Sequence, residues 1–148
     1  MSAAAPAGQI RHVEAEAEVR ACFALMRQLR PHLASADEFV ARWRRQQGAG
    51  YRLLALWQEG RPAALAGYRV LDNLTHGVHC YVDDLVTDEG QRSGGYGAAM
   101  MDRLKAEARA LGCGRLLLDT GLANALGQRF YFRNGLLATA LRFMIPLD

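Results

Sequence analysis

The 148-residue sequence is poor in cysteine, in lysine and in long apolar runs. Its three cysteines, Cys22, Cys80 and Cys113, are odd in number and far apart, which fits neither a disulfide framework nor a zinc-ligand pattern and favours a reducing compartment. No apolar stretch approaches the roughly 20 residues that span a bilayer. The first residues, MSAAAPAGQI, lack the features of a secretory signal. We therefore expect a cytoplasmic protein with no membrane partner.

Positive charge comes almost entirely from arginine, and the net charge is only +3. The densest basic stretch, Ala41–Gln47, lacks the interleaved aromatic residues of a base-stacking platform, so we interpret it as the solvated face of a helix. A nucleic-acid-binding domain would explain the pI of 9.0 and the cluster of Arg42, Arg44 and Arg45, and its binding would depend steeply on salt. It would not explain the glycines that follow in the chain, and we expect no nucleic-acid partner.

Periodicity and turn residues predict an α/β fold in one domain, residues 1–148, with residues 1–8 as a frayed terminus. The expected order is strand, two helices, a three-stranded antiparallel meander, helix, strand, helix and strand. A mixed sheet would have helices on its faces. After the first strand we expect helices Val13–Leu33, kinked or ended by Pro31, and Ser35–Gln47, which begins with a capping box of Ser35 and Glu38. Strands Tyr51–Trp57, Ala63–Leu71 and Val78–Thr87 and a helix ending at Gly112 follow. The last elements are strand Arg115–Thr120, buried on both faces, helix Asn124–Asn134 with Gly135 as its left-handed C-terminal cap, and strand Leu137–Leu147.

Glycines lie where the third meander strand gives way to a helix. A helix N-terminus offers unpaired N–H groups and a positive dipole end, and glycine lets a bulky anion approach the backbone. No G-x-x-x-x-G-K-[ST] motif occurs, and Met100 interrupts the dinucleotide pattern G-x-G-x-x-G, so both of those phosphate loops are excluded. The motif present is R-x-x-G-x-G, formed by Arg92, Gly95 and Gly97. These glycines alone would equally suit a plain flexible turn.

That motif resembles the [RQ]-x-x-G-x-[GA] signature of the GNAT N-acetyltransferases. A second block, NALGQRFYFRNGL, is similar to the family's N-x-x-A-x-x-x-Y-x-x-x-G-F segment, with Asn124, Tyr131 and Gly135 in register. The resemblance covers the C-terminal half of the chain. The sequence departs from the family pattern at Glu89, Gly127 and Leu136, where proline, alanine and phenylalanine are usual.

The resemblance implies the GNAT acyl-CoA N-acyltransferase fold and acetyl-CoA as co-substrate, with its pyrophosphate on the loop amides and its pantetheine arm along the edge of a strand. The implied cofactor-binding residues are Leu85, Val86, Thr87, Arg92, Ser93, Gly94, Gly95, Tyr96, Gly97, Ala98, Asn124 and Tyr131. A homodimer is also common in the family.

Acetyl transfer from a thioester requires a neutral amine, whereas a free alkylamine has a pKa near 10.4, so a base must remove its proton. The resemblance assigns the base and the amine anchor to Asp83 and Asp84, in either order. Successive side chains of a strand point to opposite faces, so only one would face the cleft unless a bulge redirects both. Either acid could instead pair with an arginine.

The departing thiolate needs a proton donor, and Tyr131 matches the family's general acid. The oxyanion would be held by a backbone N–H near Leu85 or Val86. We expect no metal site, because the spacing of His76 and His79 suits a helix better than a strand and no acid or cysteine set completes a ligand cluster.

The predicted activity is transfer of acetyl from acetyl-CoA to a primary amine by direct attack in a ternary complex. The acidic pair favours a small cationic amine as acceptor. Two alternatives remain: a protein or peptide N-acetyltransferase, and a non-catalytic acyl-CoA sensor, which would not need Asp83, Asp84 or Tyr131.

Overall fold

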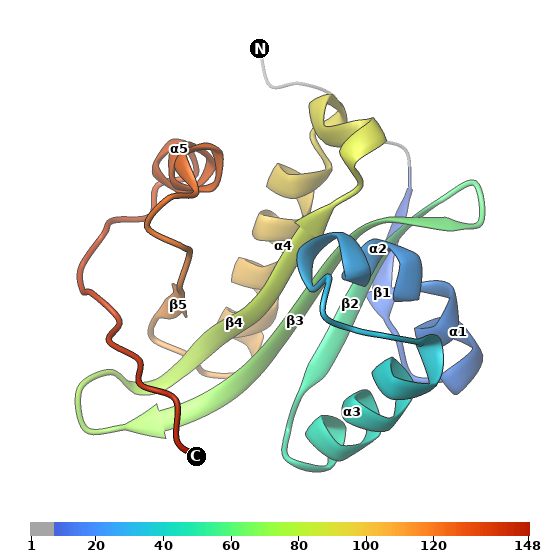
Figure 1. The fold of residues 1–148 in the computed structure, drawn as a ribbon. Helices are drawn as coiled ribbons and strands as arrows, with labels where there is room; N and C mark the ends of the chain where they lie inside the picture. The colour runs from blue at the N-terminus through green and yellow to red at the C-terminus, as the bar shows by residue number, and fades with distance from the viewer. Residues whose placement is uncertain (1–7) are drawn as a thin grey trace. The chain divides into compact units, whose positions relative to one another are not determined.

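The computed structural model describes residues 8–148, apart from the side chains of Arg92 and Ser93. The chain divides into two compact units, Met1–Leu117 and Leu118–Asp148. The first contains β1 (Gln9–His12), α1 (Glu16–Ala21), α2 (Phe23–Leu29), α3 (Ala36–Gly48), β2 (Arg52–Gln58), β3 (Arg61–Asn73), β4 (Gly77–Thr87), the 3-10 helix η1 (Glu89–Gly94) and α4 (Tyr96–Ala110) (Figure 1). Strand β5 (Leu116–Leu118) lies at the boundary, and α5 (Ala125–Arg133) belongs to the second unit.

The strands form one sheet in the order β1-β2-β3-β4-β5, which confirms the predicted mixed sheet. Strands β1 to β4 pair in antiparallel fashion with their neighbours. At the start of β4, Gly114 N–H donates to Val78 O and Cys80 N–H donates to Arg115 O, both at 2.9 Å. The expected strand at Arg115–Thr120 is shorter in the structure, and its leucines are half-buried rather than buried on both faces, because β5 is an edge strand.

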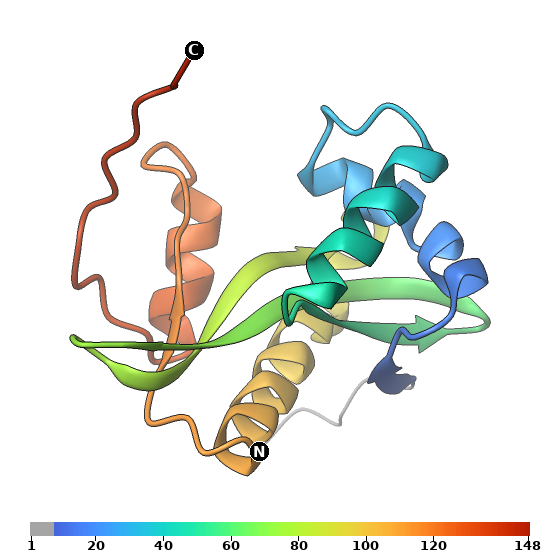
Figure 2. The same ribbon diagram turned by 90° about the horizontal axis from the view of Figure 1, so that it is seen from below.

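Helices cover both faces of the sheet in the first unit, with α1, α2 and α3 on one face and α4 on the other (Figure 2). Successive side chains of β2 point to opposite faces of the sheet. Leu53 and Ala55 belong to the core cluster under α1–α3, so Leu54 and Leu56 point to the opposite face. The core residues from α1–α3 are Val19, Cys22, Leu25, Met26, Phe39, Val40 and Trp43. Their burial supplies the apolar stabilisation of this face.

The N-terminal helical segment is divided where one helix was predicted. Val13 precedes α1 and its N–H donates to Leu53 O, while α1 and α2 meet at Cys22. The helical spacing continues through the junction because both helices bury residues in the same core, so periodicity did not reveal the division. As expected, helix α2 ends before Pro31, at Leu29.

The start of α3 confirms the Ser35 half of the predicted capping box. Ser35 Oγ accepts a hydrogen bond from Glu38 N–H at 3.1 Å, and Glu38 Oε2 accepts one from Ala34 N–H at 2.9 Å. The carboxylate therefore reaches the residue before the cap rather than the cap itself.

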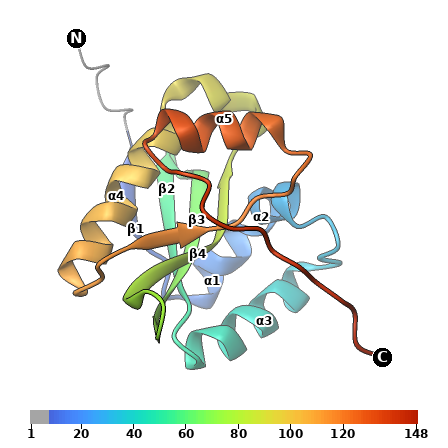
Figure 3. The same ribbon diagram turned by 90° about the vertical axis from the view of Figure 1, so that its left-hand side faces the viewer.

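The second unit contains one helix and an irregular C-terminal segment (Figure 3). Gly135 has φ 88° and follows the C-cap, as predicted, and Leu136 N–H donates to Tyr131 O. The strand predicted at Leu137–Leu147 is wrong, because this segment has no helix or strand. Its large apolar side chains are exposed, Phe143 at 89%, so the β-like composition is not accompanied by a paired strand.

The cysteines generate a prediction about thiol reactivity. Cys22 and Cys80 are fully buried, and burial raises the pKa of each thiol to about 12, whereas Cys113 is half-buried. Because the thiolate is the reactive form, Ellman's reagent at pH 8 should modify Cys113 first and the other two only in denaturant. The variant Cys113→Ser should remove the early phase. Rapid reaction of all three thiols in native buffer would contradict the described core.

Candidate functional site

A β-bulge in the β3–β4 ladder positions the acidic pair. Gly67 lies opposite Asp84, and the next residue, Tyr68, lies opposite Val82, so Asp83 is the extra residue. The bulge is the one condition under which the sequence allowed both carboxylates to reach the same face. Gly67 and Arg69, two apart on β3, share that face, and the groups that bind the two carboxylates lie on it.

Asp84 is held by two donors from different elements. Tyr51 Oη donates to Asp84 Oδ2 at 2.7 Å, and Arg30 Nε donates to Asp84 Oδ1 at 2.9 Å. Tyr51 is 4% exposed, and this burial, followed by the charge of Asp84, raises the pKa of the phenol well above its ordinary value. Tyr51 therefore stays a neutral donor that fixes the orientation of the carboxylate.

Asp83 forms a bidentate ion pair with Arg69. Arg69 Nε and Nη2 donate to the two carboxylate oxygens at 2.8 Å each, and the guanidinium lies 5.7 Å from the centre of the Tyr81 ring. The Asp83 hydrogen bond raises the pKa of Arg69 further above its ordinary value. Both acids thus pair with arginines, which was the alternative to a catalytic role considered from the sequence. Because both oxygens of Asp83 accept from the same guanidinium, Asp83 is held more firmly than Asp84.

Arg30, which no sequence motif selects, connects the two acids. Besides its bond to Asp84, its Nη2 donates to Asp83 O at 2.7 Å. Arg30 is the residue after α2, directly before Pro31, so the end of this helix sets its position. An arginine that acts across the fold has no local signal, and only the contact between α2 and β4 reveals it.

Gly67 is required by a close approach. A Cβ built on Gly67 would lie 1.8 Å from Tyr51 Oη, which is far inside any allowed contact. The phenol therefore passes directly over the glycine to reach Asp84. Sequence reasoning missed this residue, because a single glycine in a strand indicates a bulge or a close approach without saying what approaches.

A cavity of about 200 Å³ opens beside Asp84. It is lined by Met26, Arg30, His32, Leu33, Phe39, Arg42, Trp43, Gln46, Tyr51 and Asp84. The apolar members Met26, Leu33, Phe39 and Trp43 are buried, whereas His32, Arg42 and Gln46 are exposed. Trp43 therefore belongs to the core cluster and also lines the cavity.

The glycine turn forms the N-terminus of α4. Gly95 has φ 77°, and α4 begins at Tyr96 without a side-chain cap. The first helical bond is Ala99 N–H to Gly95 O, so the N–H groups of Tyr96, Gly97 and Ala98 precede the intrahelical ladder. These are donors that the sequence predicted for a phosphate. The Tyr96 side chain is 9% exposed, so only its backbone suits that role.

The other residues of this turn have different surroundings. A Cβ at Gly94 would lie 2.5 Å from the Tyr96 ring, so this glycine makes room for an aromatic side chain. The predicted side-chain roles of Arg92 and Ser93 lie outside the described residues. Gln28 on α2 holds the start of the turn by donating to Asp88 Oδ1 at 3.1 Å and accepting from Glu89 N–H at 3.1 Å.

The segment predicted to bind pantetheine is the end of β4. Leu85, Val86 and Thr87 lie opposite residues 66, 65 and 64 of β3. Val86 is 8% exposed and belongs to the core cluster, whereas Leu85 and Thr87 are half-buried. Because the Val86 side chain is buried in the core, Val86 could contact a ligand only through its backbone.

Asn124 and Tyr131 belong to the second unit and are described within it. Asn124 caps α5, with Oδ1 accepting from Gly127 N–H at 3.0 Å and Nδ2 donating to Thr120 Oγ1 at 2.9 Å. Tyr131 is half-buried, and its ring meets Phe130 edge-on with centroids 5.5 Å apart. Phe132 is 56% exposed, so the three consecutive aromatic residues do not share one buried face.

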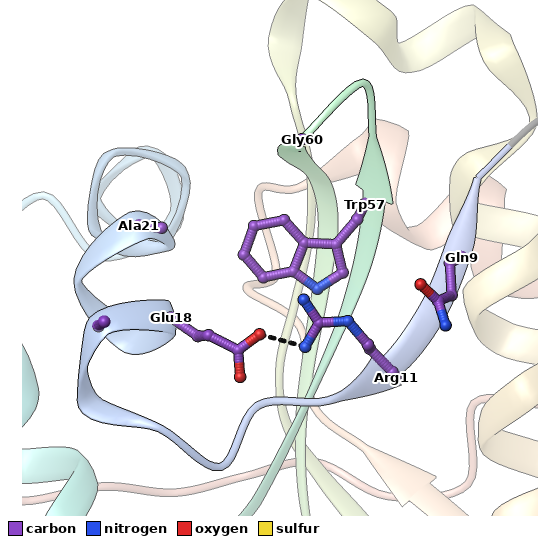
Figure 4. A pocket seen from close by; sticks show the side chains of 7 residues that line it. Gln9, Arg11, Glu18, Ala21, Trp57 and Gly60 are labelled. Carbon is purple, nitrogen blue, oxygen red and sulfur yellow. Dashed lines mark hydrogen bonds and ion pairs between the residues drawn. The ribbon is translucent and has the colours of Figure 1, made fainter.

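A larger hollow, of about 530 Å³, is lined by described residues that include none of the predicted site residues (Figure 4). Arg11 pairs with Glu18 and lies 4.8 Å from the centre of the Trp57 ring. This hollow is shallow and contains neither a residue of the two motifs nor a member of the acidic pair, so it is the weaker candidate for chemistry.

The two histidines considered for a metal have other partners. His79 Nδ1 lies 2.8 Å from Gly77 O, and Arg115 Nη1 donates to His76 Nδ1 at 2.8 Å. Across residues 8–148, no three His, Cys, Asp or Glu side chains are grouped as metal ligands would be. In the same part of the chain, no helix has the length and apolar character needed to cross a membrane.

Comparison with known proteins shows that residues 14–136 match the acetyltransferase (GNAT) family. The uncharacterized N-acetyltransferase YhdJ of Bacillus subtilis (strain 168) is 35% identical over 85 residues, which are 57% of this chain. The chain spans about three fifths of the length of this curated relative, 60% being aligned.

Solved structures show the same fold. An aminoglycoside N-acetyltransferase in complex with CoA has a TM-score of 0.84 at 14% identity, covering 99% of both chains. Glucosamine-6-phosphate N-acetyltransferase from Arabidopsis thaliana has a TM-score of 0.75 at 22% identity, covering 95% of this chain and 99% of that one. A Trypanosoma brucei acetyltransferase gives the same values.

Replacing Gly67 should disrupt the arrangement around Asp84. In Gly67→Ala the new methyl group would overlap Tyr51 Oη, so we expect a loss of about 1–3 kcal/mol in the free energy of unfolding, measured by urea denaturation. Gly48→Ala is the matched control, because no atom lies within 4 Å of a Cβ there. It should be neutral or slightly stabilising. Equal stability of the two variants would show that Tyr51 does not occupy the space over Gly67.

Proposed function

The chain belongs to the acetyltransferase (GNAT) family, and from this premise we propose that it transfers the acetyl group of acetyl-CoA to a primary amine by direct attack in a ternary complex. The observation that carries the proposal is Asp84, a carboxylate oriented by Tyr51 and Arg30 at the wall of a cavity. A sensor that only bound acyl-CoA would have no need for an oriented carboxylate at the wall of a cavity separate from the glycine turn.

Acetyl-CoA binding is proposed at the turn before α4. The N–H groups of Tyr96, Gly97 and Ala98 and the dipole of the helix would hold the pyrophosphate. The fit is supported by the uncapped helix start and by the open space around Gly95, where nothing lies within 4 Å of a Cβ. The arm of the cofactor would lie along the backbone of Leu85–Thr87, and the cofactor supplies the thioester that the amine attacks.

The proton transfers follow from the residues proposed for them. Asp84, directly or through water, would first take one proton from the ammonium, so that the neutral amine nitrogen can attack the carbonyl carbon. As the carbon–sulfur bond breaks, the nitrogen loses its second proton, which would replace, through water, the one that Tyr131 gives up. Tyr131 would return a proton to the departing thiolate. Asp83 acts as a positioning residue, because it is held by a bidentate ion pair with Arg69 and, unlike Asp84, does not line the cavity.

The acceptor is proposed to be a small amine that arrives as its ammonium cation. The cavity of about 200 Å³ is below the range of roughly 300–1,000 Å³ typical of drug-sized ligands. Two structural relatives are named for an aminoglycoside and an amino-sugar phosphate as acceptors. Their low identity means that the cavity of this chain, not the relatives, must indicate the acceptor.

Cofactor binding can be tested with two substitutions of Gly95 that differ in charge. Asn and Asp both tolerate a positive φ, so Gly95→Asn and Gly95→Asp should fold alike. The negative charge of the aspartate at the helix N-terminus should also interact favourably with the helix dipole. Only the aspartate repels a pyrophosphate, so we expect it to weaken acetyl-CoA binding by at least about tenfold relative to the asparagine variant. Calorimetric titration measures the affinities. Equal affinities would remove the pyrophosphate from this turn.

The proposed base can be tested by comparing Asp84→Asn with Asp83→Asn. We expect Asp84→Asn to lower kcat by about 10²–10⁴-fold, because the amide keeps an acceptor for Tyr51 but cannot take a proton. Asp83→Asn should lose much less. Acetyl-CoA affinity, measured on the same samples, should be unchanged in both. A larger loss of kcat in the Asp83 variant would reverse the two roles.

A further inference from the structure

We propose that the acceptor carries a negatively charged group, a carboxylate or a phosphate, in addition to its amine. The cavity beside Asp84 would bind the ammonium at that carboxylate and the anion at Arg42 and His32 on its rim. This inference rests on the proposed function, because it concerns the acceptor of the same site.

The balance of charge around the cavity is the first support. Among the described residues, Asp84 is the only carboxylate that lines it, whereas Arg30, Arg42 and His32 all do. Asp84 accepts from Arg30 at 2.9 Å and from Tyr51, and a carboxylate has about four lone-pair sites, so it can also accept from an ammonium. The opposite charges needed for an amine with an anionic tail are therefore both present.

Arg42 has donors left for a ligand. Its Nη2 lies 3.0 Å from Glu38 Oε1, while the other oxygen of Glu38 accepts from Ala34 N–H. A guanidinium has five N–H donors, so one ion pair leaves most of them available. The Arg42 and Glu38 side chains are 44% and 31% exposed, and such a surface pair contributes little, so an added anion need not displace a strong partner.

Gln46 extends the same rim. It lies one helical turn after Arg42 on α3, and both line the cavity. The Gln46 side-chain amide adds an uncharged N–H donor for a carboxylate or phosphate oxygen. The floor beneath is apolar, with Met26, Leu33, Phe39 and Trp43 buried, which suits a short hydrocarbon spacer between amine and anion.

A diamine or polyamine fits the cavity poorly. With one ammonium at Asp84, a second would face the Arg42 guanidinium, and like charges placed together weaken binding. The rim therefore excludes polycations as well as attracting anions, and both effects contribute to specificity.

The test uses acceptors of equal length that differ only in the tail. Binding of γ-aminobutyrate against putrescine, and of δ-aminovalerate against cadaverine, is measured by calorimetry on the whole chain without acetyl-CoA. O-phosphoethanolamine distinguishes phosphate from carboxylate. The proteins are the natural chain, Arg42→Gln, and the matched control Arg45→Gln, an exposed arginine of the same helix that does not line the cavity.

We expect the amino acids to bind at least about tenfold more tightly than the diamines, a difference that like-charge repulsion readily supplies. The preference should collapse in Arg42→Gln and persist in Arg45→Gln. Preference for the diamines, no binding of any anionic amine, or an unchanged preference in Arg42→Gln would overturn the proposal.

Acetylation of the same panel, followed by thiol release, separates this proposal from the proposed function. Acetylation of diamines in preference to amino acids would leave the acetyltransferase in place and overturn the anionic acceptor. Binding of the amino acids with loss in Arg42→Gln, but without acetylation, would support the cavity's selectivity and count against the transfer reaction.

Discussion

The contact of Tyr51 with Asp84 over Gly67 is the constraint on which the rest of the site depends. The phenol reaches the carboxylate only because β3 has no side chain at that position, and the bulge places the carboxylate there. A carboxylate with a side-chain exposure of 15% needs partners to remain favourable in the fold, and Tyr51 and Arg30 supply them from two sides. The same two bonds fix the carboxylate at the wall of the cavity.

The end of helix α2 contacts two parts of the proposed site, the acidic pair and the glycine turn. Its end positions Arg30 against the acidic pair, and Gln28, two residues earlier, bonds to Asp88 and Glu89 at the start of the glycine turn. The proposed acceptor cavity and the proposed cofactor turn therefore share one short helix. We therefore expect a change in α2 to alter both.

One departure from the family pattern has a local explanation. A Cβ at position 127 would lie 2.4 Å from Asn124 Nδ2, while Gly127 N–H bonds to Asn124 Oδ1. With Asn124 in this position, an alanine would push the amide aside, so glycine and the capping asparagine fit as a pair. The role of Asn124 within its unit is that of a helix cap, a function that the family motif does not specify.

The sequence alone determined the features that depend on local physics: the Ser35 capping box, the meander strands, the glycine at the start of α4 and the left-handed Gly135. It also determined the family, because two motifs of fixed spacing agree. The tertiary structure decided what depends on distant residues, namely the bulge that redirects Asp83 and Asp84, the arginines that bind them, and the division of the first helix at Cys22. The predicted strand at Leu137–Leu147 failed for the same reason. A strand exists only with a partner for its backbone groups, and composition specifies an extended tendency without specifying a partner.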